Sequence, residues 1–356
     1  MKKLIAFAAL GAAVVVVGTT SAALAHTTAK KASIDVGVLL PDTKSSVRWQ
    51  TQDAPDLAKA FKAAGLSASV VNAQNSATTQ KTQADAAIAN GAKVLLLVNL
   101  DSASGAAIEA DAARQGVKVI DYDRLTLGGS ASYYVSFNNV TVGQLQGKGL
   151  VSCLKASGEY GKKPVVAELN GAPTDNNATL FAQGYNSVLN PLYKNGTFKK
   201  GPNQSVPDWD NQKALTIFEG MLSKTSNNIQ AVASANDGLG NAVVQAIKNH
   251  KLSAIPVTGQ DATAQGIQNI LSGYQCMTVY KAVPLEAAAA AKLAISLIKG
   301  GKPAGINSST SNGKKKVPSV LLTPMAITKS NYKILFTQKY LKKSDVCNGA
   351  YAKLCK

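Results

Sequence analysis

Histidine, arginine and tryptophan are scarce in this chain of 356 residues. The two histidines, His26 and His250, and the four cysteines lack the spacing of a zinc site, so zinc chemistry and histidine-based triads have almost no residues to use. Only three of the 38 basic residues are arginine, and aromatic residues make up 6%. Because nucleic-acid surfaces combine arginine with interleaved aromatics, we interpret the net charge of +18 as a solvated lysine surface and expect no nucleic-acid partner.

Complete cofactor and catalytic motifs are also lacking. Gly238 and Gly240 follow a predicted strand, but the third glycine position of a dinucleotide loop holds Val243, and the sequence has no P-loop. We therefore expect no cofactor. A glycosidase carboxylate pair could be drawn from four aspartates, yet none of them lies in a recognisable catalytic motif: Asp123, Asp175, Asp237 and Asp261.

The first 25 residues differ in character from the rest. Two lysines precede an apolar run at 4–17, and the segment ends in an Ala-x-Ala pattern at 23–25. This pattern predicts a secretory signal peptide cleaved after Ala25, since the run is too short for a membrane anchor. No cysteine precedes Cys153, so the modified cysteine of a lipoprotein is absent. We expect an exported, soluble protein in the periplasm or outside the cell.

Export places the four cysteines in an oxidising compartment, where they can pair. Cys347 and Cys355 are close enough in sequence to form a disulfide within the tail. Whether Cys153 pairs with Cys276 stays open at this stage.

Apolar runs alternate with helical patterns along the whole chain, and its length allows two domains that each bury a core. This alternation predicts an α/β fold with doubly wound parallel sheets. The expected strands are 34–40, 70–71, 94–98, 117–120, 165–169, 231–235, 255–258 and 277–280. The expected helices include 77–89, 103–115, 212–222 and 285–298, and the segment 194–210 is predicted to be a polar connection.

Polar side chains follow strand after strand, at the edge where open α/β sheets bind ligands. For Asp101 and Asp237 alone, a helix N-cap is the favoured interpretation, but the whole set indicates one polar cleft. Arg48 and Arg124 lie in such loops, although lysine is the usual cation of this chain. Arginine at these positions indicates a role for its planar guanidinium group, which can donate two hydrogen bonds side by side. Together with two loop tryptophans, these residues suit an uncharged polyol.

The residues at these strand ends resemble the bacterial D-xylose-binding proteins of ABC sugar importers, which are type I periplasmic binding proteins. The resemblance runs in order from about residue 34 to 335 and rests on eight motifs, each weak alone: Arg48-Trp49-Gln50, Tyr122-Asp123-Arg124, Ser136-Phe137-Asn138-Asn139 with Val142-Gly143-Gln144-Leu145-Gln146, Asp175-Asn176-Asn177-Ala178, Ser234-Ala235-Asn236-Asp237, Gly259-Gln260-Asp261-Ala262, Met277-Thr278-Val279-Tyr280-Lys281, and Val317-Pro318-Ser319 with Leu321-Leu322-Thr323-Pro324.

This resemblance implies two doubly wound domains joined by three hinge crossovers. After the signal peptide (1–25) and a linker (26–33), the expected domains are 34–138 plus 283–322 and 139–282 plus 323–340, followed by a tail at 341–356 to which the resemblance does not extend. Sugar hydroxyls would be bound by Arg48, Asp123, Arg124, Asp175, Asn177, Asn236, Asp261 and Lys281, and the sugar ring would pack on Trp49 and Trp209.

Three departures from the family pattern bear on which sugar is bound. Val47 stands where the family has an acid before the first arginine. Ser205 replaces the first of two tryptophans, and Pro41-Asp42 stands where the family shows two acids. These changes affect the identity of the sugar more than its class.

The resemblance implies a non-enzymatic, monomeric receptor that delivers an aldopentose, D-xylose in the first place, to an ABC transporter permease. Two alternatives stay open. One is a sugar sensor of the same fold that signals to a chemoreceptor or histidine kinase, and the other is a carbohydrate-active enzyme of the cell envelope.

Overall fold

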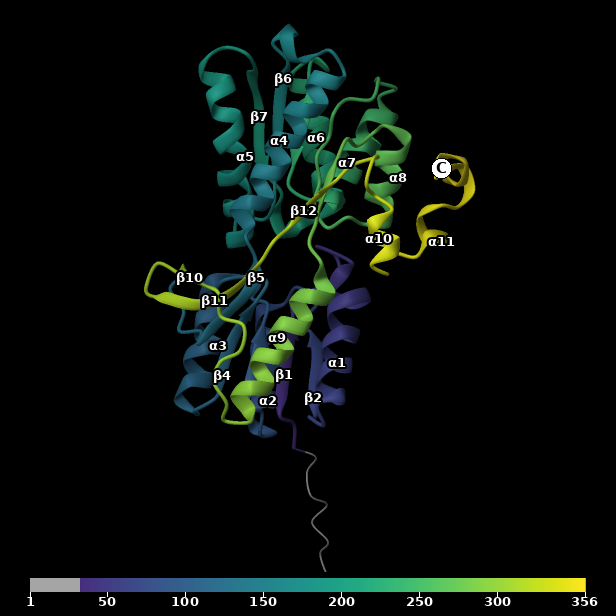
Figure 1. Ribbon diagram of the computed structural model, residues 1–356. Coiled ribbons are helices and arrows are strands. Elements are labelled where there is room, and N and C mark those ends of the chain that lie inside the picture. Colours follow the sequence, from purple (N-terminus) through teal and green to yellow (C-terminus); the bar gives the residue numbers. More distant parts are fainter. Residues whose placement is uncertain (1–32, 356) are drawn as a thin grey trace, which may run out of the picture. The chain divides into compact units, whose positions relative to one another are not determined.

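The computed structural model describes residues 33–355 (Figure 1). The predicted signal peptide and its cleavage site lie outside the described residues. Among the residues described, no helix combines the length and apolar character needed to cross a membrane.

A seven-stranded sheet forms the first half of the fold, in the order β10-β11-β5-β4-β3-β1-β2. All neighbouring strands are parallel except β10 and β11. The strands are β1 (Val36–Leu40), β2 (Ala68–Asn72), β3 (Val94–Leu97), β4 (Lys118–Tyr122), β5 (Tyr133–Phe137), β10 (Ser308–Ser311) and β11 (Lys316–Leu322).

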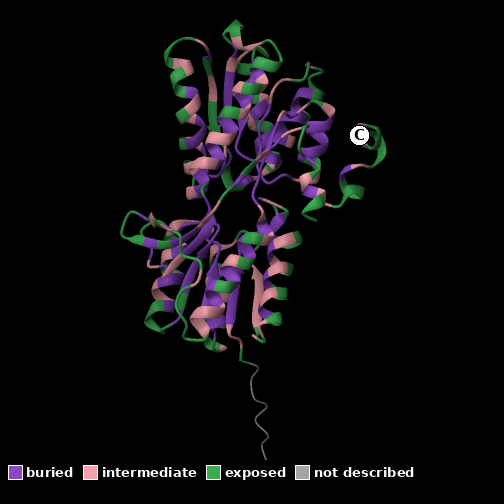
Figure 2. Cartoon of the chain, in the orientation of Figure 1, coloured by how far each residue is buried: buried purple, intermediate pink, exposed green. Residues whose placement is uncertain are grey.

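Helices cover both faces of this sheet, and its central strands β1 and β3 accordingly contain no polar side chain. Val36 and Val38 of β1 pack with α1 (Ala54–Ala63) and α9 (Val283–Ile298), which lie side by side (Figure 1). Leu39, on the opposite face of the same strand, packs with α2 (Ala77–Ala89) and α3 (Ser102–Arg114). The two-residue period of a strand thus divides one apolar run between two cores. β1 and β3 are buried along their whole length (Figure 2).

A second group of strands forms two smaller sheets, in the orders β7-β6-β8 and β12-β9. The strands are β6 (Val165–Asn170), β7 (Lys199–Ser205), β8 (Ala231–Ser234), β9 (Thr278–Tyr280) and β12 (Met325–Ile327). The helices around them are α4 (Asn139–Ala156), α5 (Asn176–Lys194), α6 (Asn211–Lys224), α7 (Asp237–Asn249) and α8 (Ala264–Ser272).

The chain passes between the two groups of strands three times. α4 follows β5 directly, α9 follows β9, and β12 pairs with β9 just after β11 has paired with β5. This is the predicted α/β fold with two sheet-centred halves and three crossovers. The exact residue boundaries of the two domains remain a prediction.

Two details of the predicted secondary structure are wrong. The segment 194–210 contains the edge strand β7, which the sequence conceals because Lys199–Ser205 has no apolar residue and includes Gly201 and Pro202. The expected strand 255–258 is reduced to a single bridge between Val257 and Val232. Strand pairing at an edge needs backbone groups only, so a hydrophobic pattern does not reveal it.

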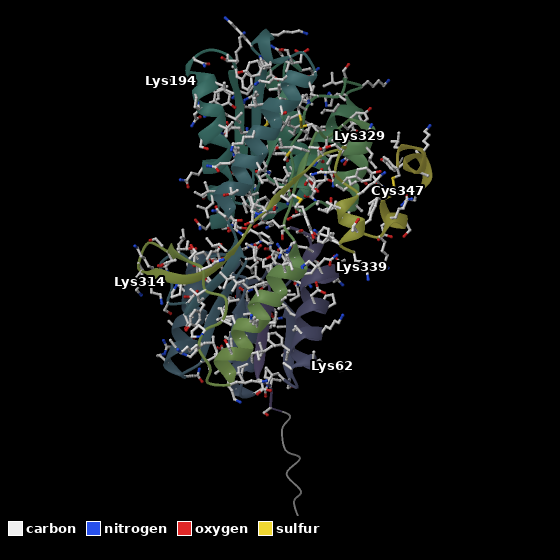
Figure 3. The ribbon with its side chains drawn as sticks, in the orientation of Figure 1. Lys62, Lys194, Lys314, Lys329, Lys339 and Cys347 are labelled. Carbon is white, nitrogen blue, oxygen red and sulfur yellow. A yellow bond between two sulfur atoms is a disulfide. The ribbon has the colours of Figure 1, made fainter. Side chains whose placement is uncertain are left out.

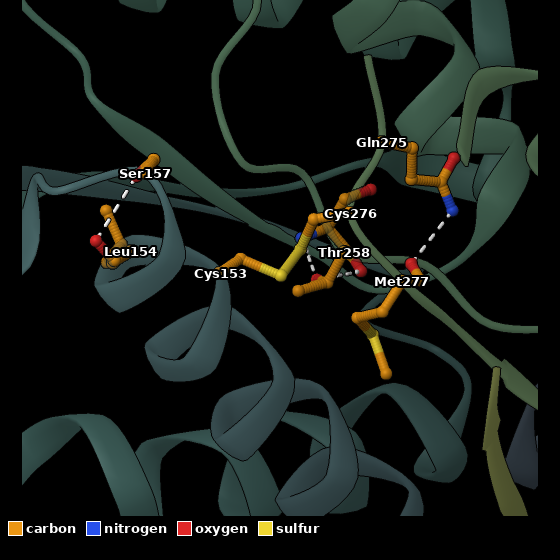
Figure 4. The surroundings of a disulfide bond; sticks show 8 residues. Cys153, Leu154, Ser157, Thr258, Gln275, Cys276 and Met277 are labelled. Atoms are coloured by element: carbon orange, nitrogen blue, oxygen red, sulfur yellow. Dashed lines mark hydrogen bonds between the residues drawn. A yellow bond between two sulfur atoms is a disulfide. The ribbon is translucent and has the colours of Figure 1, made fainter. Parts of the chain in front are cut away.

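Both cysteine pairs are disulfide-bonded. Cys153 on α4 is bonded to Cys276 in the loop before β9 (Figure 4), and Cys347 is bonded to Cys355 in the tail. The tail follows α10 (Ile334–Thr337) and contains α11 (Lys343–Val346) and a 3-10 helix at Gly349–Leu354. It packs on α8, where Gln268 donates to the carbonyl of Val346.

Lysine side chains on both halves of the fold are exposed. Lys62, Lys194 and Lys314 are examples (Figure 3), as expected for a solvated lysine surface.

Helices α4 and α5 pack closely because glycines face each other across their contact. A Cβ added at Gly143 would clash with the carbonyl oxygen of Phe181, and one added at Gly184 would clash with that of Val140. Gly143 therefore sets the position of α5, whose first turn carries Asn177 of the candidate site.

We predict that Gly143→Ala lowers the free energy of unfolding by about 1–3 kcal/mol, as overpacking does. The matched control is Gly220→Ala in α6, where a Cβ meets no neighbour within 4 Å. That substitution should raise the free energy of unfolding by up to about 1 kcal/mol, because alanine favours a helix. Urea unfolding measures both. Equal effects of the two substitutions would show that the α4–α5 contact tolerates a methyl group.

Candidate binding site

A cavity lies at the carboxyl ends of strands from both halves of the fold, and together with the solvent at its mouth it encloses about 310 Å³. All ten residues predicted as binding residues line it: Arg48, Trp49, Asp123, Arg124, Asp175, Asn177, Trp209, Asn236, Asp261 and Lys281. Each of them is buried. The structure therefore brings together every residue that the sequence nominated, although their roles in binding remain a prediction.

Four further residues line the cavity and were missed from the sequence: Ser45, Ser46, Phe181 and Gln260. Gln260 lies inside one of the motifs, next to Asp261. Phe181 lies four residues after Asn177 on α5, so the helical repeat places both on one face. The two serines precede Arg48 in its loop and carry no signal of their own.

The charges that line the cavity balance. Three cations, Arg48, Arg124 and Lys281, face three carboxylates, Asp123, Asp175 and Asp261. Arg124 pairs with Asp175 at 2.9 Å, and Lys281 lies 3.2 Å from Asp123 and 4.0 Å from Asp261. Such a site has no excess charge for an anion or a cation to neutralise, but it has many donors and acceptors. No group of three or more potential metal ligands occurs within residues 33–355.

Asp123 links the two halves of the fold. Its carboxylate accepts hydrogen bonds from Arg48 at 2.9 Å, from Lys281 at 3.2 Å and from Asn177 at 3.0 Å. Burial acts to raise the pKa of Asp123, but the nearby cations Lys281, Arg48 and Arg124 outweigh it and lower the pKa to about 2. Asp123 is therefore ionised and accepts only, as a partner for hydroxyl donors must.

Arg48 is held mainly by the protein itself. It donates twice to Asp53, once to Glu286 at 2.6 Å and once to Asp123. Since a guanidinium has five N–H groups, one is left without a partner among the described residues. Arg48 thus contributes a single donor to the cavity and serves mainly to position Asp123.

Glu286 lies behind Arg48, outside the cavity. Burial raises the pKa of the Glu286 carboxyl to about 8, because desolvation outweighs the attraction of Arg48. Charge counting supports this direction. Two cations, Arg48 and Lys281, contact four carboxyl groups, Asp53, Asp123, Asp261 and Glu286, so a proton on Glu286 reduces an excess of negative charge.

The two tryptophans have their polar edges engaged. Trp49 donates to the hydroxyl of Ser45 at 3.1 Å, and Trp209 donates to Asp175 at 3.1 Å. Trp209 has a positive φ of 56° and packs against Gly171, where any Cβ would clash with the indole ring. With each N–H occupied, what the rings can still offer to a ligand is apolar surface.

Asn236, rather than Asp237, caps α7, because the Asn236 side chain accepts from the amide of Leu239. The expectation of an Asp237 cap is therefore wrong, whereas Asp101 caps α3 as predicted. Asp237 is buried and accepts hydrogen bonds from Thr263, Gln275 and Thr278. Burial raises its pKa to about 7. Its bonds fix the loop that presents Asp261, so sequence reasoning confused two adjacent polar residues with different roles.

Hydrogen bonds also join the two halves of the fold around the cavity. Ser46 donates to Asp261 at 3.1 Å, and Asn236 donates to the carbonyl of Ser45 at 3.3 Å. Together with the contacts of Asp123, these bonds hold the two walls of the cavity against each other.

Comparisons with known proteins agree with this geometry. A family model described as a periplasmic binding protein domain matches residues 36–302. The D-xylose-binding periplasmic protein of Escherichia coli K12 is 34% identical over 315 residues, covering 88% of this chain and 92% of that protein. A multiple sugar-binding periplasmic receptor of Rhizobium radiobacter is 33% identical, covering 86% of this chain and 90% of that protein.

Among solved structures, an ABC transporter solute-binding protein from Clostridium phytofermentans with bound β-D-glucose is similar to this chain. The TM-score is 0.81 at 30% identity, with 87% of this chain and 99% of that chain covered. The similarity therefore extends over both halves of the fold.

We predict that Glu286→Gln flattens the pH dependence of stability. Its pKa of about 8 in the folded state exceeds the ordinary unfolded value of about 4.3, so between these values the folded state holds a proton that the unfolded state has released. The free energy of unfolding of the wild type should decrease as pH rises from 5 through about 8. The decrease should be much smaller in the variant. Urea unfolding at several pH values measures it.

The control is Glu219→Gln on α6, which is only partly buried and should keep the wild-type slope. If Glu286→Gln leaves the pH dependence of the free energy of unfolding unchanged, Glu286 is ionised in the folded protein.

Proposed function

This chain belongs to the periplasmic binding protein family, and on that premise we propose that it is an exported receptor for an aldopentose, with D-xylose as its preferred sugar. The observation that carries the proposal is the cavity itself. Balanced charges, fixed carboxylates and two indole rings suit a ligand with many hydroxyls and no net charge. The curated relative named for D-xylose, at 34% identity, supports the choice of sugar.

The size of the cavity favours a small sugar. In this arrangement only about 30 Å³ of it is free for water-sized groups, because paired charges already occupy its middle. An aldopentose lacks the hydroxymethyl group of an aldohexose and so needs less room. Relatives that are named for multiple sugars, and the solved structure with glucose, make hexoses the second candidates.

Capture of the sugar would replace direct ion pairs with bridged ones. A hydroxyl group can donate to Asp123 while it accepts from Lys281, and another can bridge Asp175 and Arg124 in the same way. Hydrogen bonds to charged groups contribute roughly 1.5–3 kcal/mol each. Because the partners lie on both halves of the fold, the sugar favours the closed arrangement, which a permease can then recognise.

The remaining parts of the proposal follow from the family. The receptor acts as a monomer after cleavage of the segment 1–25, delivers its sugar to an ABC transporter permease and performs no reaction on it. Its relatives are named as binding proteins and receptors, which favours this role over an envelope enzyme. A sensor of the same fold would use the same cavity and differ only in its membrane partner.

We predict that D-xylose changes the tryptophan fluorescence saturably and raises the melting temperature. Both indoles lie in one cavity, so a bound sugar alters the surroundings of both, and a ligand of the folded state stabilises it by mass action. Trp49→Phe and Trp209→Phe should each retain part of the signal and bind more weakly. If no pentose or hexose at millimolar concentration changes either signal, the receptor function is wrong.

We predict that Arg124→Lys lowers the affinity for D-xylose by about tenfold or more, the equivalent of about 1.4 kcal/mol. The charge is retained, but the planar fork that can serve Asp175 and a hydroxyl together is lost. Arg114→Lys is the matched control, since Arg114 is an exposed residue of α3. Isothermal titration calorimetry should find the control at wild-type affinity. An Arg124→Lys protein that also binds like wild type would make Arg124 a purely structural residue.

A further inference from the structure

A second chamber adjoins the candidate binding cavity. Together with the solvent at its mouth it encloses about 900 Å³. One wall comes from the helical turn at Thr51 and Gln52, another from the start of α8 at Ala264, and the outer wall from the tail at Leu341 and Lys342. Neither the family resemblance nor the proposed capture of a single sugar ring uses this space.

The chamber and the cavity share residues. Ser46, Arg48 and Asp261 line both spaces. The hydrogen bond from Ser46 to Asp261, at 3.1 Å, lies between them and is the contact that a connecting group would displace. The two spaces are therefore neighbours across one hydroxyl–carboxylate contact rather than separate sites.

The chamber walls mix apolar and polar groups in the way that a sugar ring does. Val47, 60% exposed, contributes apolar surface together with Leu341. Gln52, Lys342 and Asp345 contribute donors and acceptors. An apolar solute would leave these polar groups unpaired, whereas a second sugar ring presents both C–H faces and hydroxyls.

We propose that this chamber is a second sugar subsite and that the receptor also takes β-linked pentose disaccharides and pentosides. This rests on the proposed function: the first ring occupies the cavity and the substituent on its linking oxygen extends into the chamber. A glycosidic oxygen carries no hydrogen, so it can accept from the Ser46 hydroxyl but cannot donate to Asp261.

The tail, which the family comparison left without a role, forms the outer wall of this subsite. Tyr340 donates to the carbonyl of Asp261 at 2.8 Å, and Gln52 donates to the carbonyl of Tyr340 at 3.1 Å. Beyond Tyr340, the bond from Gln268 to the carbonyl of Val346 holds the tail against α8, and the Cys347–Cys355 disulfide closes a loop within the tail. The wall is thus anchored at both ends, as a binding surface requires.

The test is calorimetric titration of the full mature chain with D-xylose, methyl β-D-xyloside and β-1,4-xylobiose. We expect wild-type affinities for the xyloside and xylobiose within about tenfold of that for D-xylose. Thr51→Trp places an indole in the chamber and should weaken xylobiose by more than about tenfold while D-xylose binding stays unchanged.

Thr82→Trp is the matched control. Thr51 and Thr82 are both exposed, and the hydroxyl of each donates to the carbonyl four residues earlier, at 2.9 Å and 3.0 Å. Thr82 lies on α2 and does not line the chamber, so its substitution should leave all three affinities unchanged.

The outcomes separate the two proposals. If D-xylose binds but xylobiose and the xyloside bind more than about a hundredfold more weakly, the subsite is wrong and the receptor function stands. The subsite is also wrong if xylobiose binds Thr51→Trp as well as wild type. If none of the three ligands binds, D-xylose is not the sugar of this receptor, and the subsite fails with it.

Discussion

The site depends on a buried group of charges centred on Asp123. Removing ions from water is costly, and a buried ion pair often contributes little to stability, so such a cluster is not explained as reinforcement of the fold. What it does provide is position. Asp123 is held by Arg48 from one half of the fold and by Lys281 and Asn177 from the other. Any loss of one partner leaves an uncompensated charge, so each side chain is confined to one arrangement.

Three residues of the site have unusual backbone conformations. Asp123, Trp209 and Asp261 have φ values of 62°, 56° and 95°, each of order 1–3 kcal/mol less favourable than an ordinary conformation. The surroundings compensate at Asp123, whose carbonyl accepts from Tyr134, Ser136 and Asn177. Strand ends thus turn sharply enough to aim their side chains into the cavity, and buried hydrogen bonds keep them there.

The sequence predicts what depends on local pattern and conceals what depends on distant partners. Apolar runs such as Val94–Leu97 identify strands, because a sheet covered on both faces needs them. β7 has no such run, and its pairing uses the backbone alone. The motifs identify Arg48 as a candidate sugar-binding residue. They do not reveal that its guanidinium also donates to Glu286, 238 residues away. Adjacent polar residues, Asn236 and Asp237, are separable only once their neighbours are known.

The contacts of the site fall into two classes with different consequences for opening. Arg48 is bound to Asp53 and Glu286 within one half of the fold, and Tyr122 also donates to Asp53. These bonds survive if the halves separate. The pairs Lys281–Asp123, Arg124–Asp175 and Ser46–Asp261 join opposite halves and would be lost. Opening therefore leaves Arg48 and its partners in place but separates the other pairs, so unpaired charges appear on both walls, Arg124 on one and Asp175 and Lys281 on the other. Water hydrates these groups in the open state, and sugar hydroxyls bind them in the closed state. A sugar that bridges those same pairs binds the closed state selectively, and this difference in affinity is what couples capture to closure.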